Sequence, residues 1–429
     1  MKYRLAEIGK SILILLLALL TAVLLLLVIY QGRLENAPFV SALTDFLGLN
    51  GTESVYTAAE TTTYEAARPD LVVLTTAEGH NTVSGDFDEI DTAFDIMGRY
   101  LSDALTAAQT PQIVTQAVWQ EALSGQGVYF HYCGEIPLSA LADWLRASPE
   151  DAELLQAQSG QLLLSISAGT VLLYYVEEGT YRCCETGLDA SSLLEQLESW
   201  PPDGSIFAFE SSVAAISALD GDSVLNLTSA PLLQNVAAAN PVETNSSFVN
   251  STALTLGFNP WGDTGYTAGD GSRVFSDGDC RLIISADGVV TFTQQNLSEV
   301  RFTAASTETA ALIEAARSLL LSLMSSDLGN AELYLTGFTT DGDTATAEFE
   351  YFVDGLAVQL TAGTAATVTF SGNALTSLTL RARTFTLLES TVSLLPAAQA
   401  AALVEAGSYL TVQYADSGGD LLTCGWTAG

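Results

Sequence analysis

The chain is almost devoid of lysine. Of its 429 residues, 14 are Lys or Arg and 50 are Asp or Glu, so the formal net charge is −36. The only lysines are Lys2 and Lys10, and both precede the first apolar run. We therefore expect no nucleic-acid partner, because binding to phosphate draws on clustered Lys and Arg. The same lack excludes a Gly-Lys-Ser/Thr phosphate loop, a Schiff-base lysine and a Ser-x-x-Lys hydrolase from everything after residue 10.

Histidine and cysteine are also scarce. The two histidines, His80 and His131, lie far apart in the sequence, so a histidine-rich catalytic or metal centre is poorly supplied. The cysteines are odd in number and widely spaced, which does not predict a disulfide framework; they are Cys133, Cys183, Cys184, Cys280 and Cys424. We expect buried small side chains, with one long-range disulfide as the alternative. A strand would point the adjacent Cys183 and Cys184 to opposite faces.

The sequence nevertheless contains enough apolar residues for a large core. Hydrophobic residues make up 48% of the chain and charged residues 15%. This balance excludes a disordered acidic chain, although the net charge alone would favour one. The length predicts two or three domains.

Residues 11–30 form an uncharged apolar run, SILILLLALLTAVLLLLVIY. A helix that rises about 1.5 Å per residue over this run spans the roughly 30 Å hydrocarbon core of a bilayer. The run is longer than the apolar part of a signal peptide, and no small-residue cleavage site follows it. We therefore expect an uncleaved transmembrane helix rather than a cleaved signal. Lys2, Arg4 and Lys10 precede the run and determine the topology, with the N-terminus in the cytoplasm and the bulk of the chain extracytoplasmic.

Ala18, Thr21 and Ala22 form the candidate helix–helix contact within the membrane. Small residues four positions apart allow a partner helix to approach closely. The alternative is a plain lipid-facing surface, because such a pair arises easily by chance in a span rich in Leu and Ala. The predicted localisation is the cell membrane, with a single pass.

The exported part shows the alternation of helices and strands that is typical of an α+β fold. Residues 86–108 carry apolar side chains at three- and four-residue spacing and predict an amphipathic helix. Later in the chain, Asp-Gly dipeptides separate alternating strands, a pattern that favours hairpins. We expect curved antiparallel sheets packed on helices. The predicted segments are a cytoplasmic tail (1–10), the transmembrane helix (11–30), an N-terminal exported helical region and linker (31–115), a central α+β domain (116–245) and a C-terminal antiparallel sheet plus helix domain (246–429).

No motif in the chain predicts catalysis, a metal or a cofactor. The sequences at 277–279 and 341–343 begin like calcium loops, but the twelfth residues are Gly288 and Phe352 rather than a closing Glu. We therefore predict hairpin turns at both places. His131 lies between aromatic residues and is expected to be a packed strand residue rather than a base. Paired carboxylates for glycoside chemistry stay open, because geometry rather than composition decides them. We predict that the protein is not an enzyme.

Three stretches of the exported part resemble the YycH/YycI family of Gram-positive bacteria. The first is the strand at 128–132 followed by Ile136-Pro137-Leu138. The second is Leu256-Gly257-Phe258-Asn259-Pro260 with the hairpin sequences that follow it as far as residue 290. The third is the series of a helix, strands and a terminal Gly-Trp strand over 310–426.

This resemblance implies regulation rather than catalysis. Members of the family modulate an essential membrane sensor histidine kinase that controls cell-wall metabolism, through their membrane helices and exported domains. The implied partners are such a kinase and a paralogous YycH/YycI-type protein. The alternative interpretation is an anchored cell-envelope ligand-binding or wall-processing protein that uses its curved sheets as a ligand groove.

Overall fold

The computed structural model describes residues 54–55, 63–262, 265–297, 300–324 and 327–429. The described residues belong to one unit, Ser54–Gly429, which holds two large sheets and a two-stranded ribbon. The predicted transmembrane helix at 11–30 lies outside them. Among the helices that the structure does describe, none combines the length and apolar character needed to cross a bilayer.

The first sheet has nine strands within the described residues, and all of its pairings are antiparallel. The strand order is β10-β9-β3-β2-β5-β6-β7-β8-β4. The strands are β2 (Leu71–Thr75), β3 (His80–Ser84), β4 (Gln112–Ile113), β5 (Gly127–Pro137), β6 (Gln158–Ser167), β7 (Thr170–Glu177), β8 (Thr180–Asp189), β9 (Ser205–Phe207) and β10 (Val224–Asn226).

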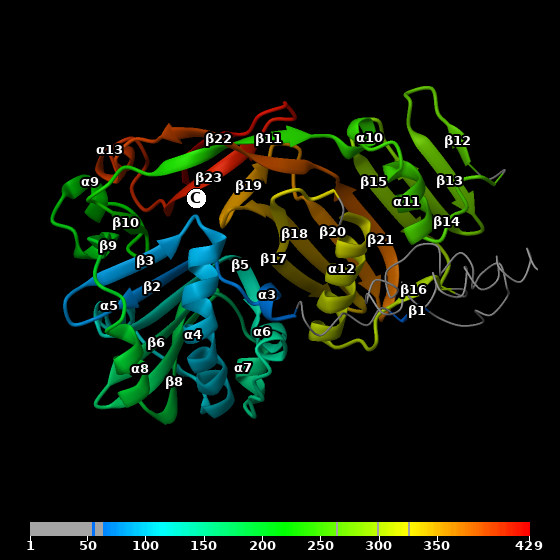
Figure 1. Ribbon diagram of the computed structural model, residues 1–429. Helices are drawn as coiled ribbons and strands as arrows, with labels where there is room; N and C mark the ends of the chain where they lie inside the picture. Colours follow the sequence, from blue (N-terminus) through cyan, green and yellow to red (C-terminus); the bar gives the residue numbers. More distant parts are fainter. Residues whose placement is uncertain (1–53, 56–62, 263–264, 298–299, 325–326) are drawn as a thin grey trace, which may run out of the picture. The chain divides into compact units, whose positions relative to one another are not determined.

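Helices cover both faces of this sheet. The helices α4 (Phe87–Ala107) and α8 (Ser191–Leu197) pack on one face, as Figure 1 shows. The Asp86 carboxylate begins α4 by accepting hydrogen bonds from the backbone N–H groups of Asp88 (2.9 Å) and Glu89 (3.1 Å). The predicted helix at 86–108 is confirmed, with a buried stripe formed by Ile90, Phe94, Met97, Leu101 and Leu105. On the opposite face lies α5 (Gln116–Ser124), whose Trp119 is fully buried.

The second sheet has thirteen strands within the described part of the chain. Its main path is β12-β13-β14-β15-β21-β20-β18-β19-β23-β24, with β17 paired to β18 and with β16 between β1 and β21. Only the pairs β1–β16 and β19–β23 are parallel among these. The strands are β1 (Ser54–Val55), β12 (Gly265–Thr267), β13 (Arg273–Asp277), β14 (Cys280–Ile284), β15 (Val289–Gln294), β16 (Phe302–Thr303), β17 (Ala331–Asp341), β18 (Thr344–Val353), β19 (Leu356–Leu360), β20 (Ala366–Ser371), β21 (Ala374–Arg381), β23 (Leu410–Asp416) and β24 (Thr423–Ala428).

The Asp-Gly dipeptides lie where hairpins were predicted. Turns at 277–279 and 341–343 join β13 to β14 and β17 to β18, so both apparent calcium loops are hairpin turns. Asp354 and Gly355 join β18 to β19 with φ of 53° and 77°. Two successive positive φ angles define the tight hairpin turn that Asp-Gly favours.

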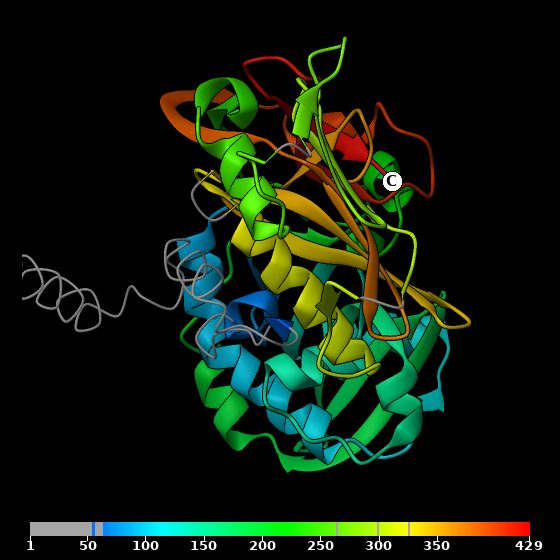
Figure 2. The same ribbon diagram turned by 90° about the vertical axis from the view of Figure 1, so that its right-hand side faces the viewer.

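The helix α12 (Thr309–Met324) packs on the second sheet and also contacts the first half of the chain. Figure 2 shows α12 lying across this sheet. Trp144 of α6 (Leu138–Trp144) donates a hydrogen bond from its ring N–H to Glu314 (3.3 Å), which also pairs with Arg317. The helices not yet described are α3 (Thr63–Ala66), α7 (Ala152–Gln156), α9 (Ala214–Ser217), α10 (Pro241–Thr244), α11 (Phe248–Thr255), α13 (Ala397–Ala401) and the 3-10 turn η1 (Ala208–Glu210).

The structure corrects four expectations about single elements. The predicted helical region at 31–115 contains β2 and β3, because β2 pairs with β5 in the first sheet and β3 pairs with β2. The alternation of Leu378, Leu380 and Ala382 with polar residues predicts one strand over 375–385, but the structure divides it into β21 and β22 (Thr384–Ser393), and β22 leaves the sheet to pair with β11 (Leu232–Ala239) in the ribbon. The sequence also favours a strand over 205–210, but this strand ends at Phe207 and the chain continues as η1. It favours a final helix over 396–406, but the helix ends at Ala401, beyond which Leu403 is 75% exposed and finds no core.

Strand pairing crosses both of the domain boundaries that the sequence predicts after residue 31. The first sheet joins strands from before and after position 115/116, and β11 of the central segment pairs with β22 of the C-terminal segment. The division into 31–115, 116–245 and 246–429 stays a prediction.

Candidate functional site

The residues that the sequence singles out for function lie outside the described residues. These are the candidate membrane contact at Ala18, Thr21 and Ala22 and the topology determinants Lys2, Arg4 and Lys10. Both sets stay predictions. Within the described residues, two groups of polar side chains stand out because they are buried and lie between parts of the fold that are distant in sequence.

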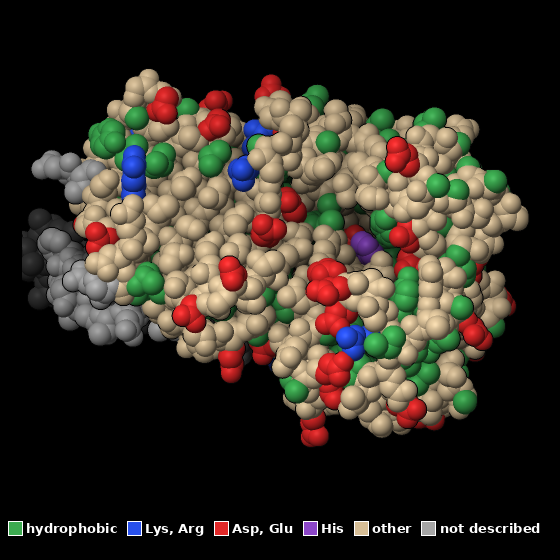
Figure 3. All heavy atoms as spheres, turned by 180° about the vertical axis from the view of Figure 1, so that it is seen from behind, with side chains coloured by type: hydrophobic (Ala, Val, Ile, Leu, Met, Phe, Trp, Pro, Cys, Tyr) green, Lys and Arg blue, Asp and Glu red, His purple; other side chains and the backbone are tan. Residues whose placement is uncertain are grey.

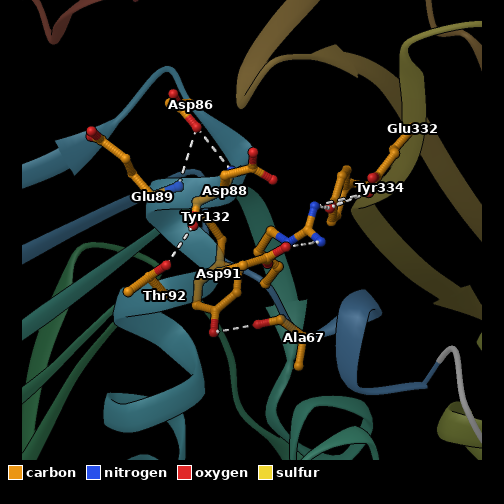
Figure 4. A network of polar contacts seen from close by, with 10 residues as sticks. Ala67, Asp86, Asp88, Glu89, Asp91, Thr92, Tyr132, Glu332 and Tyr334 are labelled. Atoms are coloured by element: carbon orange, nitrogen blue, oxygen red, sulfur yellow. Dashed lines mark hydrogen bonds and ion pairs between the residues drawn. The ribbon is translucent and has the colours of Figure 1, made fainter.

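The first group, which we call the Arg68 junction, joins α4 to β17. The Arg68 side chain is 5% exposed and pairs with Asp91 of α4 and Glu332 of β17. Its Nη1 donates to Glu332 (3.0 Å) and to the Tyr334 hydroxyl (2.7 Å), and its Nη2 donates to Asp91 (2.9 Å). The guanidinium carbon lies 4.7 Å from the ring centroid of Phe87. Figure 4 shows Asp91 approaching this junction from one side and Glu332 and Tyr334 from the other.

A pocket with about 300 Å³ of space between its atoms adjoins the Arg68 junction. Asp70, Cys133 and Phe352 are among the residues that line it. The donors of Arg68 are directed at protein acceptors rather than at this space, which makes the junction a structural connection between the sheets. Phe352 is buried because it faces this junction, although Glu348 on the same face of β18 is exposed to water.

A bulge in β5 brings the first sheet against β17. Between His131 and Ile136 the strand advances five positions while its partner β6 advances two, from Gln161 to Ser159. The extra residues leave the ladder and approach β17 so closely that a Cβ atom on Gly134 would lie 2.0 Å from the Thr336 carbonyl oxygen. Only a glycine fits at such a distance.

The second group, which we call the acidic–aromatic hollow, is centred on Asp70, Tyr129, His131, Asp222 and Tyr409. His131 on β5 forms a hydrogen bond through Nδ1 with Asp70 (2.9 Å), just before β2. Its ring stacks on Tyr409, with centroids 5.1 Å apart and planes 6° from parallel. The prediction that His131 is a packed strand residue is confirmed. Figure 3 shows a hollow in this face of the molecule with a histidine at its base and acidic side chains around it.

Backbone hydrogen bonds hold the loop that carries Asp222 against the C-terminal segment. Asp220 donates its N–H to the Ser408 carbonyl (2.9 Å), and Leu410 donates its N–H to the Ser223 hydroxyl (3.1 Å). The Asp222 carboxylate accepts the ring N–H of Trp119, at 3.1 Å from each oxygen. Four parts of the chain therefore meet at the hollow: Asp70 just before β2, the strand β5, the loop at 220–223 and the start of β23.

Burial and mutual repulsion shift the pKa values in the hollow. Burial raises the pKa of Asp222 to about 6, against the stabilising Trp119 hydrogen bond. The pKa of His131 is also raised, because Asp70 and Asp222 together outweigh the opposing effect of burial. Burial, reinforced by the charges of Asp70 and Asp222, holds the pKa of Tyr129 and of Tyr409 well above the ordinary value. The hollow therefore attracts protons and, by the same field, other cations.

The arrangement suits binding better than catalysis. Cys133 lies two residues beyond His131, but burial and the charges of Asp70 and Glu350 raise the pKa of its thiol to about 12, so it is a poor nucleophile. All five cysteines are described and none forms a disulfide. Cys183 and Cys184 point to opposite faces of β8, as predicted. The part of the chain that the structure describes contains no group of three or more His, Cys, Asp or Glu side chains placed to hold a metal.

Comparison with known proteins identifies the fold. No model of a known protein family matches the chain, and no curated protein matches it either. Among solved structures, the chain is similar to the crystal structure of YycH from Bacillus subtilis, with a TM-score of 0.54 and 12% sequence identity over 88% of this chain and 96% of that one. The chain has a YycH-like fold. The fold that the resemblance of the three sequence stretches implied is thus supported by the three-dimensional arrangement, and the α+β fold class is confirmed for the described residues.

Sequence reasoning missed both groups of buried polar residues. Arg68 and Asp222 have no local motif, and their partners are far along the chain. One available signal was the alternation of Leu333 and Leu335 with polar residues, which would have predicted β17 and so the surface that Arg68 meets.

Proposed function

We propose that this protein is a single-pass membrane protein whose extracytoplasmic part regulates a sensor histidine kinase that governs cell-wall homeostasis. The observation that carries the proposal is the YycH-like fold, which covers 96% of YycH. The uncharged run at 11–30 supplies the anchor, and Lys2, Arg4 and Lys10 keep the N-terminus in the cytoplasm. A paralogous YycH/YycI-type protein is the second partner that we propose.

Regulation of this kind must act through a difference in binding. A partner changes the signalling state of a kinase only if it binds one state more tightly than the other, and about 1.4 kcal/mol of difference shifts the balance tenfold. The membrane helix can supply part of that difference if Ala18, Thr21 and Ala22 allow close packing against a kinase helix. The exported unit can supply the remainder through contacts outside the membrane.

The test is co-purification of the full-length chain with a sensor histidine kinase of the same organism, together with a measurement of kinase autophosphorylation. We expect the native chain to bind the kinase and change its activity. The double variant Ala18→Leu/Ala22→Leu should weaken both effects, because the larger side chains block close approach. Val23→Leu is the control for a substitution within the same run: it adds one methylene at a position outside the small-residue pair, so it should leave both effects unchanged.

Two results would count against parts of the proposal. If the native chain neither binds nor affects the kinase, regulation of that kinase is wrong. If replacement of residues 11–30 by an unrelated hydrophobic helix leaves binding and kinase activity unchanged, contact through the membrane helix is wrong, and the exported unit alone carries the interaction. Repeating both measurements with the paralogous protein present tests the second partner.

A further inference from the structure

The acidic–aromatic hollow contains a buried hydroxyl group without a hydrogen-bond partner. Tyr129 is 1% exposed, and its hydroxyl has no partner among the described residues. The Tyr129 ring lies 6.2 Å from that of Trp119, which bonds to Asp222, and 6.4 Å from that of His131, which bonds to Asp70. Native proteins rarely leave a buried hydroxyl unpaired, because its lost hydration is not repaid.

Asp222 is a second under-satisfied group in the same place. It is 5% exposed, and among the described residues its carboxylate accepts side-chain hydrogen bonds only from the single ring N–H of Trp119. A carboxylate offers about four acceptor positions, and buried ones are normally paired with a cation. No Arg lies within ion-pair distance of Asp222 in the described part of the chain.

Among the described residues, His131 lies in the field of Asp222, but it also bonds to Asp70, and the exported part has no lysine that could supply a second cation. Both lysines of the chain precede residue 11, and the arginines of the described ion pairs are engaged elsewhere. Aromatic faces around the hollow add to the attraction: Tyr181 lies against Trp119 with centroids 5.6 Å apart, and Tyr409 lies against His131. Such faces favour an organic cation over an anion.

We propose that the hollow binds an organic cation that carries N–H donors, namely a primary ammonium or a guanidinium group. The donors would fill the free acceptor positions of Asp222 and reach the oxygen of Tyr129. The proposal does not depend on the proposed regulation of a kinase. The same chemistry is offered by a free small amine and by a lysine or arginine side chain of another protein, and the experiment separates these sources.

The ring N–H of Trp119 provides a direct probe of binding, because it bonds to Asp222. The chain has five tryptophans, so full-length protein labelled with 5-fluorotryptophan gives five fluorine resonances, and Trp119→Phe identifies the one that matters. The probes are butylammonium and butylguanidinium, a capped Gly-Lys-Gly peptide, and tetramethylammonium and sodium at matched ionic strength. We expect butylammonium and butylguanidinium to shift the Trp119 resonance saturably, with a Kd below roughly 1 mM, and we expect no saturable shift from tetramethylammonium or sodium.

Isosteric variants test the two groups that carry the proposal. Asp222→Asn should weaken butylammonium binding at least about tenfold, and Tyr129→Phe should weaken it about fivefold. Tyr175→Phe is the matched control: Tyr175 is also a fully buried strand residue with an unpaired hydroxyl, but it lies on the opposite face of the sheet. Asp279→Asn removes one charge from a hairpin turn of the other sheet and controls for net charge.

The outcomes separate as follows. Binding of butylammonium without binding of the peptide supports the proposal with a free amine as the ligand, and binding of both supports it with a protein side chain as the source. The absence of any saturable shift would overturn the proposal. Equal binding of tetramethylammonium would also overturn it, because that ion has no N–H donor. Unchanged affinity in both Asp222→Asn and Tyr129→Phe, with native circular dichroism, would place the ligand elsewhere.

Discussion

The close approach of β5 to β17 makes a sharp prediction for the substitution Gly134→Ala. The added Cβ atom would lie 2.0 Å from the Thr336 carbonyl oxygen and 2.7 Å from its Cα, whereas ordinary contact begins near 3.4 Å. The backbones must therefore separate by roughly 1.4 Å at this point. All of the nearest atoms belong to the backbone, so no side-chain rotation relieves the clash. Overpacking of this kind costs about 1–3 kcal/mol.

Gly425→Ala is the matched control for this substitution. Gly425 also lies within a strand, β24, but a Cβ atom there meets nothing within 4 Å and its φ is not positive. Replacing glycine by alanine at an unstrained site stabilises a protein by about 0.4–1 kcal/mol, because the unfolded chain loses freedom. The same gain applies at Gly134, so the difference between the two variants isolates the clash. We expect Gly134→Ala to be less stable than Gly425→Ala by about 1–3 kcal/mol.

The assay is urea unfolding of the full-length chain, followed by circular dichroism, together with amide hydrogen exchange read by mass spectrometry. Exchange should accelerate in peptides from β17 and from the bulge of β5 in Gly134→Ala, while β6 and β7 away from the bulge keep their protection. Equal stability of the two variants, within about 0.5 kcal/mol, would refute the reasoning. Unchanged exchange in β17 would show that the two sheets do not meet at Gly134.

Three further predictions follow from the buried charges and thiols. Arg68→Met should lower the free energy of unfolding by about 2–4 kcal/mol. Arg68→Lys should recover less than half of that loss, because an ammonium cannot reach two carboxylates and a hydroxyl at once. Substitution of the exposed Arg99 by Met is the control, and an equal effect of Arg68→Met and Arg99→Met in urea unfolding would contradict the prediction. Burial raises the pKa of Asp222 to about 6 and of Glu350 to about 7, and the pKa of His131 is raised as well, so the folded chain takes up protons that the unfolded chain does not. The free energy of unfolding should therefore rise as pH falls from about 8 to about 5, by at most about 1.4 kcal/mol per pH unit for each proton. The profile should be flatter for Asp222→Asn and for Glu350→Gln, and a flat profile for the native chain would contradict the prediction. All five thiols should react slowly with a thiol reagent in the folded chain and fully once the chain is unfolded without reductant. A disulfide found by mass spectrometry would show that the cysteines are not all free.

The local elements were predictable because their causes are local. The stripe of α4 repeats every three or four residues, and Asp86 precedes it as a cap. The hairpin at Asp354-Gly355 follows from the ability of those two residues to take positive φ. Both signals lie within a few residues of the structure that they specify. A single sequence is therefore enough to read them.

The connections between the sheets were not predictable for the opposite reason. Arg68 and Glu332 are 264 positions apart, and Trp119 and Asp222 are 103 positions apart. Nothing near Arg68 distinguishes it from an exposed arginine, and nothing near Asp222 distinguishes it from the many carboxylates on the surface. The pairing of β22 was unpredictable for the same reason. Its sequence pattern fits a strand of the second sheet, but it pairs with the distant β11 in the two-stranded ribbon.

The scarcity of lysine acquires a second meaning in the folded chain. In the sequence it contributes to the predicted topology, because both lysines lie before the apolar run. In the structure it means that a carboxylate buried far from the arginines has no lysine to pair with. Arg383 pairs with the buried Asp416, whereas Asp222 accepts a ring N–H from Trp119 and shares the field of His131 with Asp70. Two carboxylates that share one histidine beside an unpaired hydroxyl favour a further positive charge in the ligand that we propose for the hollow.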